Sequence, residues 1–235
     1  MCKHQRMIRP VCSILLAIVG LALIAVVAVA AWFFVYTGDL PNLERLSEFA
    51  PAAPSMVSDP CLAGPSAAIP FDQIGAPLRD AVGAAENPKS MPLQIARSLT
   101  CDHNKGRIDR GLKQLRLEWH IRTNFSADQV FIIYANRAYF GPGMTGVENA
   151  SKGIFQKDPA ALGIDEAALL AGLIRAPSVY SPYLHPERAL GRRNRVLEDM
   201  VAAGKLPAGD LARLKATPLL LPQSSSRARQ QIAPI

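Results

Sequence analysis

Residues 126–143 read "SADQVFIIYANRAYFGPG" and decide the class of fold that this chain can adopt. Ser126 is of a type that caps helix N-termini, because its side-chain oxygen accepts a hydrogen bond from a free backbone N–H group. The segment that follows, up to Phe140, is apolar on nearly every side, which is typical of a helix buried in a core. The GPG sequence at 141–143 then breaks the helix. The stretch therefore predicts a buried helix over residues 126–140.

Helical periodicity recurs on both sides of this segment. One earlier helix begins with Pro77 in its first turn, and its apolar residues follow the i, i+3, i+4, i+7 spacing at Leu78, Ala81, Val82 and Ala85. Further helices are expected at residues 107–122, 147–155, 165–175, 186–203 and 207–215. No convincing strand pattern interrupts them, so the sequence predicts an all-α domain.

The expected helix at 107–122 is amphipathic. One face holds Leu112, Leu115 and Trp119, and the apolar face of such a helix normally packs against a core. The opposite arc carries the polar residues Arg110, Lys113, Gln114 and Glu118. Among the later helices, Asp165 is expected to cap one N-terminus and Gly204 to follow one C-terminus. Three arginines of the expected helix at 186–203 are expected on a solvated or headgroup-facing surface: Arg192, Arg193 and Arg195.

Residues 11–36 carry no charge and are long enough to cross the hydrocarbon core of a bilayer as a helix. Rings that favour the membrane interface cluster at the end of this run, at Trp32, Phe33, Phe34 and Tyr36. Three cations precede it, at Lys3, Arg6 and Arg9, and the positive-inside rule places the N-terminus in the cytoplasm. The sequence thus predicts a single-pass anchor. The alternative is a cleavable signal peptide with the AVA sequence at 28–30 as its processing site.

The predicted parts are a cytoplasmic N-terminus (1–10), a transmembrane anchor (11–36), a stalk (37–70), a helical domain (71–223) and a polar tail (224–235). The formal net charge of +7 suits anionic lipid headgroups or a phosphorylated substrate, whereas export argues against a nucleic-acid partner. Cys61 and Cys101 lie in the exported part, where they either form a disulfide or remain free thiols. No cysteine spacing suggests a metal site.

Two longer stretches carry a family resemblance: "IIYANRAYFGPGMTGVENASKGIFQK" at 132–157 and "DEAALLAGLIRAPSVYSPYLHPERALGRRNRVLEDM" at 165–200. They resemble the glycosyltransferase (transglycosylase) domain of class A penicillin-binding proteins and of monofunctional peptidoglycan glycosyltransferases. The resemblance implies a lysozyme-like helical fold on the outer face of the cytoplasmic membrane. It also implies polymerisation of lipid II into glycan strands during cell-wall synthesis. Neither an SxxK nor a KTG motif is present, so no transpeptidase domain is expected.

The resemblance assigns roles to particular residues. Glu86 matches the glutamate that takes a proton from the 4-hydroxyl group of the acceptor sugar. Substrate-binding positions are matched by Gln94, Arg97, Arg110, Lys113 and Asn136. The three cations among them would neutralise the departing undecaprenyl pyrophosphate. A divalent metal can assist in the family, although no carboxylate pair in this sequence argues for one.

Other positions of the same motifs have a structural alternative. Gly141, Gly143 and Gly146 match turns. For Asn136 and for Glu148, the alternative to a reactive role is to tie a turn to the buried helix.

The sequence departs from the family pattern beside Glu86. Asn87 replaces an acid, and the chain passes through Pro88 and Lys89 without the mobile segment of the family. Gln114 occupies the place of a second essential glutamate, and a glutamine cannot transfer a proton at neutral pH. Glu118, one helical turn further along, is the candidate replacement.

Three functions therefore stay open on the sequence. The first is a peptidoglycan glycosyltransferase. The second is a catalytically inactive relative that binds lipid II or glycan, or that scaffolds cell-wall synthesis proteins. The third is a glycan hydrolase, because lysozyme-like folds can cleave glycans with one glutamate. The first function requires Glu86 to lie near the cationic side chains.

Overall fold

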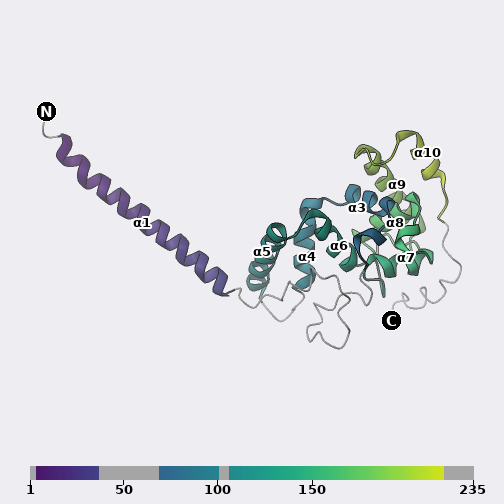
Figure 1. The fold of residues 1–235 in the computed structure, drawn as a ribbon, viewed down its shortest axis with the longest axis horizontal. Helices are drawn as coiled ribbons and strands as arrows, with labels where there is room; N and C mark the ends of the chain where they lie inside the picture. The colour runs from purple at the N-terminus through teal and green to yellow at the C-terminus, as the bar shows by residue number, and fades with distance from the viewer. Residues whose placement is uncertain (1–3, 37–68, 101–105, 220–235) are drawn as a thin grey trace.

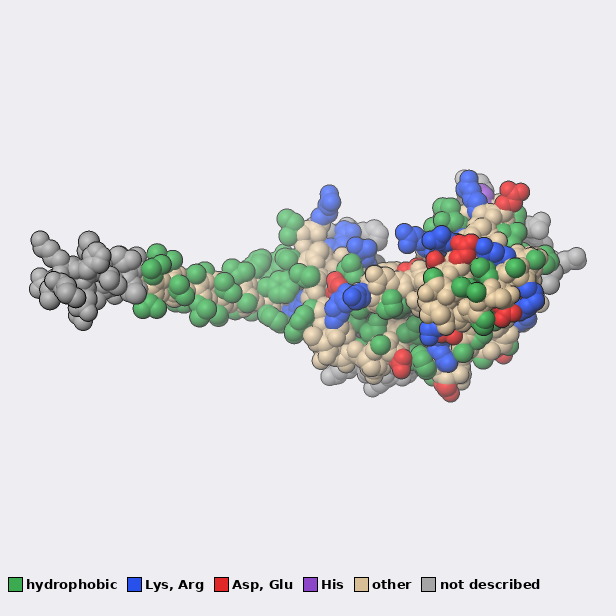
Figure 2. Space-filling model, turned by 90° about the horizontal axis from the view of Figure 1, so that it is seen from above, with side chains coloured by type: hydrophobic (Ala, Val, Ile, Leu, Met, Phe, Trp, Pro, Cys, Tyr) green, Lys and Arg blue, Asp and Glu red, His purple; other side chains and the backbone are tan. Residues whose placement is uncertain are grey.

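The structure is a computed structural model, and it describes residues 4–36, 69–100 and 106–219, with side chains of the first range described from residue 15. One long N-terminal helix, α1 (His4–Tyr36), leads toward a body of shorter helices (Figure 1). Its segment Leu15–Tyr36 is long and apolar enough to cross a membrane. In Figure 2 the described part of α1 presents almost only hydrophobic side chains. These properties agree with the predicted anchor and are shared by signal sequences.

The body consists of short helices joined by tight turns. In chain order they are η1 (Phe71–Gln73), α3 (Ala76–Ala85), η2 (Pro88–Ser90), α4 (Met91–Leu99), α5 (Arg107–Asn124), α6 (Ala127–Arg137), α7 (Val147–Phe155), η3 (Pro159–Ala161), α8 (Ile164–Ile174), α9 (Pro186–Ala202) and α10 (Ala208–Ala216). The β-structure of the described ranges is one isolated bridge between Tyr139 and Thr145. The prediction of an all-α domain is therefore confirmed for these ranges.

The helices form two groups. One packs α3 against α8 and α9, with α10 on α9, and the other packs α4 against α5 and α6. Figure 1 shows the second group on the side of the body that faces α1. The short segment from Glu86 to Ser90 connects α3 of one group directly to α4 of the other. A side chain on this segment therefore lies at the boundary between the two groups.

A shared apolar core holds the two groups together. Helix α8 is the clearest case, because every residue from Ala167 to Leu173 is buried. A helix that is apolar on all sides needs neighbours on all sides, which explains why α8 packs between α3 and α9. Helix α6 is also buried as predicted, and Ser126 caps it in a reciprocal capping box with Gln129.

Helix α6 ends at Arg137, three residues before the predicted end. The next residues turn back on themselves, since Phe140 N–H donates to the Met144 carbonyl and Gly146 N–H donates to the Ala138 carbonyl, both at 2.9 Å. Gly141, Gly143 and Gly146 all have positive φ angles in this turn, as expected of its glycines. The backbone pairing of the turn explains why the helix stops early.

Three sequence-based expectations are wrong. The buried residues of α5 are Leu117 and Ile121, whereas Trp119 on the predicted packing face is 54% exposed. Asp165 does not cap α8, because the capping residue is Gly163, whose N–H donates to Glu166 Oε2 at 2.9 Å. Arg193 of α9, expected on a solvated surface, is buried.

Arg193 is 1% exposed and therefore not part of a solvated surface. Its guanidinium donates to the carbonyls of Thr217 at 2.7 Å and Lys215 at 3.0 Å, and to Asn194 Oδ1. The residue thus ties α9 to the chain that follows α10. As predicted, Gly204 follows α9 with a positive φ angle.

Some predictions fall on residues that the structure does not describe. The stalk lies outside the described ranges except for its last two residues, and so do Cys61, Cys101 and the polar tail. The boundaries of the predicted parts stay predictions.

Candidate functional site

Glu86 lies at the C-terminal end of α3, at the boundary between the two helix groups. Its backbone N–H donates to the Val82 carbonyl at 2.9 Å, and its extended φ and ψ angles turn the chain out of the helix. The helix dipole does not favour a carboxylate there, because a helix C-terminus carries partial negative charge. Glu86 is nevertheless only 8% exposed. A buried carboxylate is costly unless it is hydrogen-bonded, so its partners matter.

Gln94 of α4 supplies a partner. Its Nε2 lies 3.4 Å from Glu86 Oε2 and 3.2 Å from Ser90 Oγ. Its Oε1 accepts a hydrogen bond of 3.1 Å from the hydroxyl of Tyr134 on α6. One amide therefore connects α3, η2 and α6.

Tyr134 fixes the orientation of this amide. Burial raises the pKa of the Tyr134 phenol, and the nearby Glu86 charge raises it further. The phenol is therefore protonated across the ordinary pH range and donates to the amide oxygen of Gln94. The amide nitrogen is then directed toward Glu86, where it can act only as a donor.

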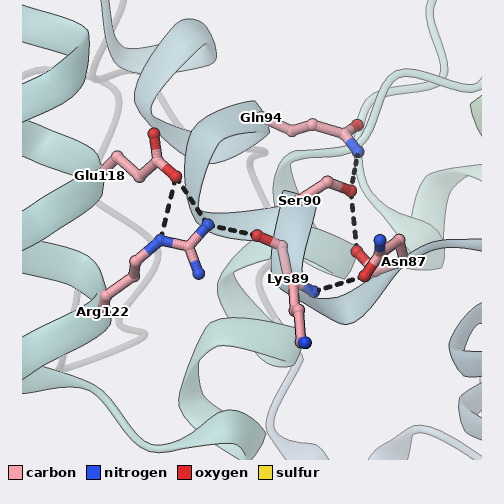
Figure 3. Close-up of polar contacts among 6 residues, drawn as sticks. All are labelled: Asn87, Lys89, Ser90, Gln94, Glu118 and Arg122. Atoms are coloured by element: carbon pink, nitrogen blue, oxygen red, sulfur yellow. Dashed lines mark hydrogen bonds and ion pairs between the residues drawn. The ribbon is translucent and has the colours of Figure 1, made fainter.

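Glu118, the candidate replacement base, forms an ion pair within α5. Arg122 approaches Glu118 Oε1 with Nε at 2.9 Å and Nη2 at 2.6 Å (Figure 3). The same Nη2 donates to the backbone carbonyl of Lys89 in η2. Glu118 thus holds the arginine that ties α5 to the junction beside Glu86. This contact gives Glu118 a structural role at the site.

Helices α4 and α5 run antiparallel. Arg122, near the end of α5, reaches Lys89 just before α4, whereas Gln114 donates to Thr100 Oγ1 at 2.9 Å just after α4. Gln114 therefore lies at the end of α4 that is remote from Glu86. The nine residues of α4 separate these ends by about 13 Å at 1.5 Å per residue. The position that the resemblance assigns to a second glutamate thus holds a neutral amide, which is hydrogen-bonded to Thr100.

The three predicted cations lie toward this same remote end. Arg97 is exposed on the last turn of α4. Arg110 and Lys113 belong to the turn of α5 before Gln114, and Lys113 lies 3.8 Å from Asp109 of its own helix. Within the described ranges, no lysine or arginine forms an ion pair with Glu86. Glu86 therefore meets α4 at Gln94, about one helical turn before Arg97, whereas Arg110 and Lys113 lie toward the other end of the α4–α5 pair.

Asn136 has structural contacts, but with Ile69 and not with a turn. Its Nδ2 donates to the Ile69 carbonyl at 2.9 Å, and its Oδ1 accepts from the Ile69 N–H at 3.0 Å. Both ends of the amide are used within the protein, and the residue is 4% exposed. Asn136 thus holds the start of the domain against α6. Glu148 instead pairs with Lys152 of its own helix at 2.6 Å.

Within the described ranges, no group of three or more His, Cys, Asp and Glu side chains could bind a metal ion. Glu86 and Glu118 are engaged by Gln94 and Arg122, respectively.

The sequence did not single out Tyr134, Ser90 or Arg122 as site residues. Tyr134 had a usable signal, because a phenol within the buried apolar run of α6 needs a hydrogen-bond partner. Arg122 had none, since its contact with Lys89 depends on how α5 packs beside η2. Ser90 contacts Gln94, four residues later in the continuous η2–α4 segment.

Comparison with known proteins identifies one family. Residues 90–201 match the family model described as Transglycosylase. This match begins just after Glu86 and includes Gln94, Arg97, Arg110, Lys113 and Gln114. The base candidate itself therefore lies outside the matched residues.

Individual relatives agree with this match. Penicillin-binding protein 1A of Aquifex aeolicus is 40% identical over 47% of this chain, and penicillin-binding protein 1C of Escherichia coli is 36% identical over 62%. This chain spans only 15% and 18% of their lengths. A protein of Cupriavidus necator, named provisionally as a transglycosylase, is 29% identical over 84% of this chain and 90% of its own length. Penicillin-binding protein 1A of Haemophilus influenzae, a solved structure, aligns with a TM-score of 0.46 and 20% identity over 71% of this chain and 20% of that chain.

Proposed function

Since this chain carries a domain of the transglycosylase family, we propose that it is a peptidoglycan glycosyltransferase that polymerises lipid II into glycan strands. The observation that carries the proposal is the buried Glu86 carboxylate, which Gln94 holds at the boundary between the two helix groups. A general base must be held in a defined position to take a proton from a bound hydroxyl group.

The proposed reaction uses Glu86 beside Gln94 and the cations that lie further along α4 and α5. Glu86 takes the proton of the acceptor 4-hydroxyl, whose oxygen forms a bond to C1 of the donor sugar. The bond from C1 to the undecaprenyl pyrophosphate breaks, and the bonding electrons leave with the pyrophosphate. Arg97, Arg110 and Lys113 would neutralise its charge, since oriented cations stabilise charge that develops in a transition state.

The proposed arrangement places this reaction outside the cytoplasmic membrane. Helix α1 is the anchor, and the cations Lys3, Arg6 and Arg9 keep the N-terminus in the cytoplasm. Residues 37–70 form the stalk and residues 71–223 the glycosyltransferase-like domain. Lipid II, membrane lipids and cell-wall synthesis proteins are the proposed partners.

A second candidate function is a relative that binds lipid II or glycan without turnover. Two observations favour it: Gln114 is a neutral amide, and the Glu118 carboxylate is paired with Arg122. A chain that needed only to hold a lipid diphosphate would keep the cations and could lose the second acid.

The deciding experiment incubates the full chain, purified in detergent, with labelled lipid II and measures glycan polymer on gels. We expect polymer from the wild type and none from Glu86→Gln. The matched control is Glu187→Gln, an exposed carboxylate on α9, which should polymerise normally. Saturable lipid II binding without polymer would instead support the second function. Release of fragments from intact sacculi would support a hydrolase and contradict both.

A further inference from the structure

Residues 86–90 form the junction between α3 and α4 and carry the base candidate. This junction is closed by its own hydrogen bonds. Asn87 Oδ1 accepts from the Lys89 N–H at 3.0 Å, and the Asn87 carbonyl accepts from the hydroxyl and the N–H of Ser90, both at 2.8 Å (Figure 3). Pro88 fixes one more φ angle inside the turn. The junction is therefore compact, so a shift of one of its residues shifts the others.

Arg122 of α5 holds this junction from outside. Its Nη2 donates to the Lys89 carbonyl, and this contact joins residues 33 positions apart in the chain. The same guanidinium donates with Nε and Nη2 to Oε1 of Glu118, one turn earlier on α5 (Figure 3). A guanidinium is planar, so two hydrogen bonds to one carboxylate fix the plane in which its donors lie. Glu118 thereby directs Arg122 toward Lys89.

Stability of α5 alone does not explain this ion pair. The side chains of Arg122 and Glu118 are 42% and 19% exposed, and surface pairs at i, i+4 spacing contribute little to stability. Arg195 forms the same kind of pair with Asp199 on α9. Among the described residues, however, Arg195 contacts only acids of its own helix. The pair on α5 differs because Arg122 also binds the backbone of another element.

The position of the junction decides whether Glu86 meets Gln94. The backbone of Glu86 is bonded to α3, Arg122 bonds Lys89 to α5, and the chain between these two attachments is short. The contact from Gln94 Nε2 to Glu86 Oε2 measures 3.4 Å, which is longer than the usual range of about 2.7–3.2 Å. A small outward shift of the junction would therefore break it. A misplacement of about 1 Å can lower the rate of a reaction by roughly a hundredfold.

We propose that Arg122, oriented by Glu118, is a positioning residue for Glu86. It holds the Lys89 carbonyl, and the short junction passes this restraint to the Glu86 carboxylate. The kinetic consequence rests on the proposed function, because the position of Glu86 affects a rate only if Glu86 is the base. The restraint itself is a property of the fold and can be measured without lipid II.

Limited proteolysis of the full chain in detergent measures the restraint. Endoproteinase Lys-C cuts on the carbonyl side of lysine, and Lys89 is an exposed residue whose carbonyl is the one that Arg122 binds. We expect the bond between Lys89 and Ser90 to be cut roughly tenfold faster in Arg122→Gln than in the wild type. Loss of a hydrogen bond to a charged group favours local opening of the junction by about that factor. Cleavage after Lys205, whose side chain is 54% exposed, is the reference in the same digest and should not change.

Two further variants complete this test. Arg195→Gln is the matched control, and its cleavage at Lys89 should equal that of the wild type. Glu118→Gln keeps the arginine but removes the charge that orients it, so cleavage at Lys89 should rise. Equal cleavage at Lys89 in Arg122→Gln and in the wild type would overturn the inference. Equal increases at Lys89 and Lys205 would show a general loss of stability and would also overturn it.

Polymerisation kinetics measure the consequence for Glu86. We expect Arg122→Gln to lower kcat by roughly tenfold with little change in KM, and Arg195→Gln to change neither. In a Gln94→Leu background, Arg122→Gln should have little further effect, because both substitutions act on the position of Glu86. A full second loss in the double variant would overturn the positioning role. A wild type that makes no polymer would contradict the proposed function instead, and cleavage at Lys89 would still decide whether Arg122 holds the junction.

Discussion

The amide nitrogen of Gln94 lies 3.4 Å from the Oε2 atom of Glu86, across the boundary between the two helix groups. Because Tyr134 holds the other end of the amide, the nitrogen cannot turn away without breaking a second hydrogen bond. A carboxylate at a helix C-terminus thus receives a fixed donor that its own helix cannot provide. This contact distinguishes Glu86 from an ordinary solvated residue at a helix end.

Gln94→Leu should therefore lower the rate of polymerisation more than it raises KM. A hydrogen bond to a charged group contributes about 1.5–3 kcal/mol. If the contact holds Glu86 in the position needed for proton transfer, kcat falls by roughly tenfold to a hundredfold when it is lost. Initial rates measured over a range of lipid II concentrations separate the two parameters.

The control for this variant is Gln73→Leu, an exposed glutamine in η1 that should leave both parameters unchanged. A Gln94→Leu protein with wild-type kcat would show that the amide does not position Glu86.

Gln114→Glu tests whether the second acid has been lost from an otherwise competent site. The new carboxylate would lie beside Thr100 and within a helical turn of Arg110 and Lys113. We expect polymerisation faster than that of the wild type if a charged group at this place is what the chain lacks. The measurement is the yield of glycan polymer at equal protein and lipid II concentrations.

Gln114→Leu serves as its control, because it removes the amide without adding a charge. If Gln114→Glu gains no activity over wild type and still binds lipid II, the binding-only function is favoured instead.

The fold could be predicted from the sequence where the apolar residues of a helix lie on one face or on all of its faces. The buried helix around Val130 to Asn136 and the turn glycines were predictable, because burial and positive φ angles impose strict residue types. The face of α5 that packs against the core was not predictable. Its sequence has apolar residues on two sides, and periodicity cannot tell a side that meets the core from a side that meets α1 or a membrane.

The site was predictable only in part. Glu86 and Gln94 could be found from the family pattern, and the structure brings them together. The sequence could not show that Arg110 and Lys113 lie toward the other end of α4, because that depends on the antiparallel direction of α5. It also could not show that Arg193 is buried. An arginine beside two others on a helix is usually solvated. The two carbonyls that Arg193 binds belong to residues more than twenty positions later in the chain.

Arg193→Ala should destabilise the domain strongly. The substitution removes a guanidinium that donates to the carbonyls of Thr217 and Lys215. Those carbonyls lose this donor, and a cavity forms where the side chain was. We expect a loss of about 2–4 kcal/mol in the free energy of unfolding. Denaturant unfolding of the full chain in detergent micelles, followed by circular dichroism, measures this quantity.

The matched control is Arg195→Ala, whose side chain is 67% exposed and pairs with acids of its own helix. Its effect should stay below about 1 kcal/mol, because exposed ion pairs contribute little. Equal losses for the two variants would contradict the structural role of Arg193.

Tyr134→Phe should change how stability depends on pH at the alkaline end. Burial first, and Glu86 second, raise the pKa of Tyr134 in the folded protein above its ordinary value of 10.0. Below that value both the folded and unfolded states keep the proton, so the contribution of the phenol is fully present. Above it the unfolded state ionises first, and stability falls as the pH rises toward the folded-state pKa, by at most about 1.4 kcal/mol per pH unit. The phenylalanine variant lacks this loss.

At neutral pH the Tyr134→Phe variant should be less stable than the wild type by about 1 kcal/mol, because the hydrogen bond to Gln94 is gone. The difference should therefore shrink as the pH rises above 10.0, as measured by unfolding in micelles over a pH series. Tyr139→Phe, at a residue that is 52% exposed, is the control for the loss of a phenol and should be about as stable as the wild type at neutral pH. If the Tyr134→Phe difference stayed constant, the phenol would not be held in its protonated form by burial beside Glu86.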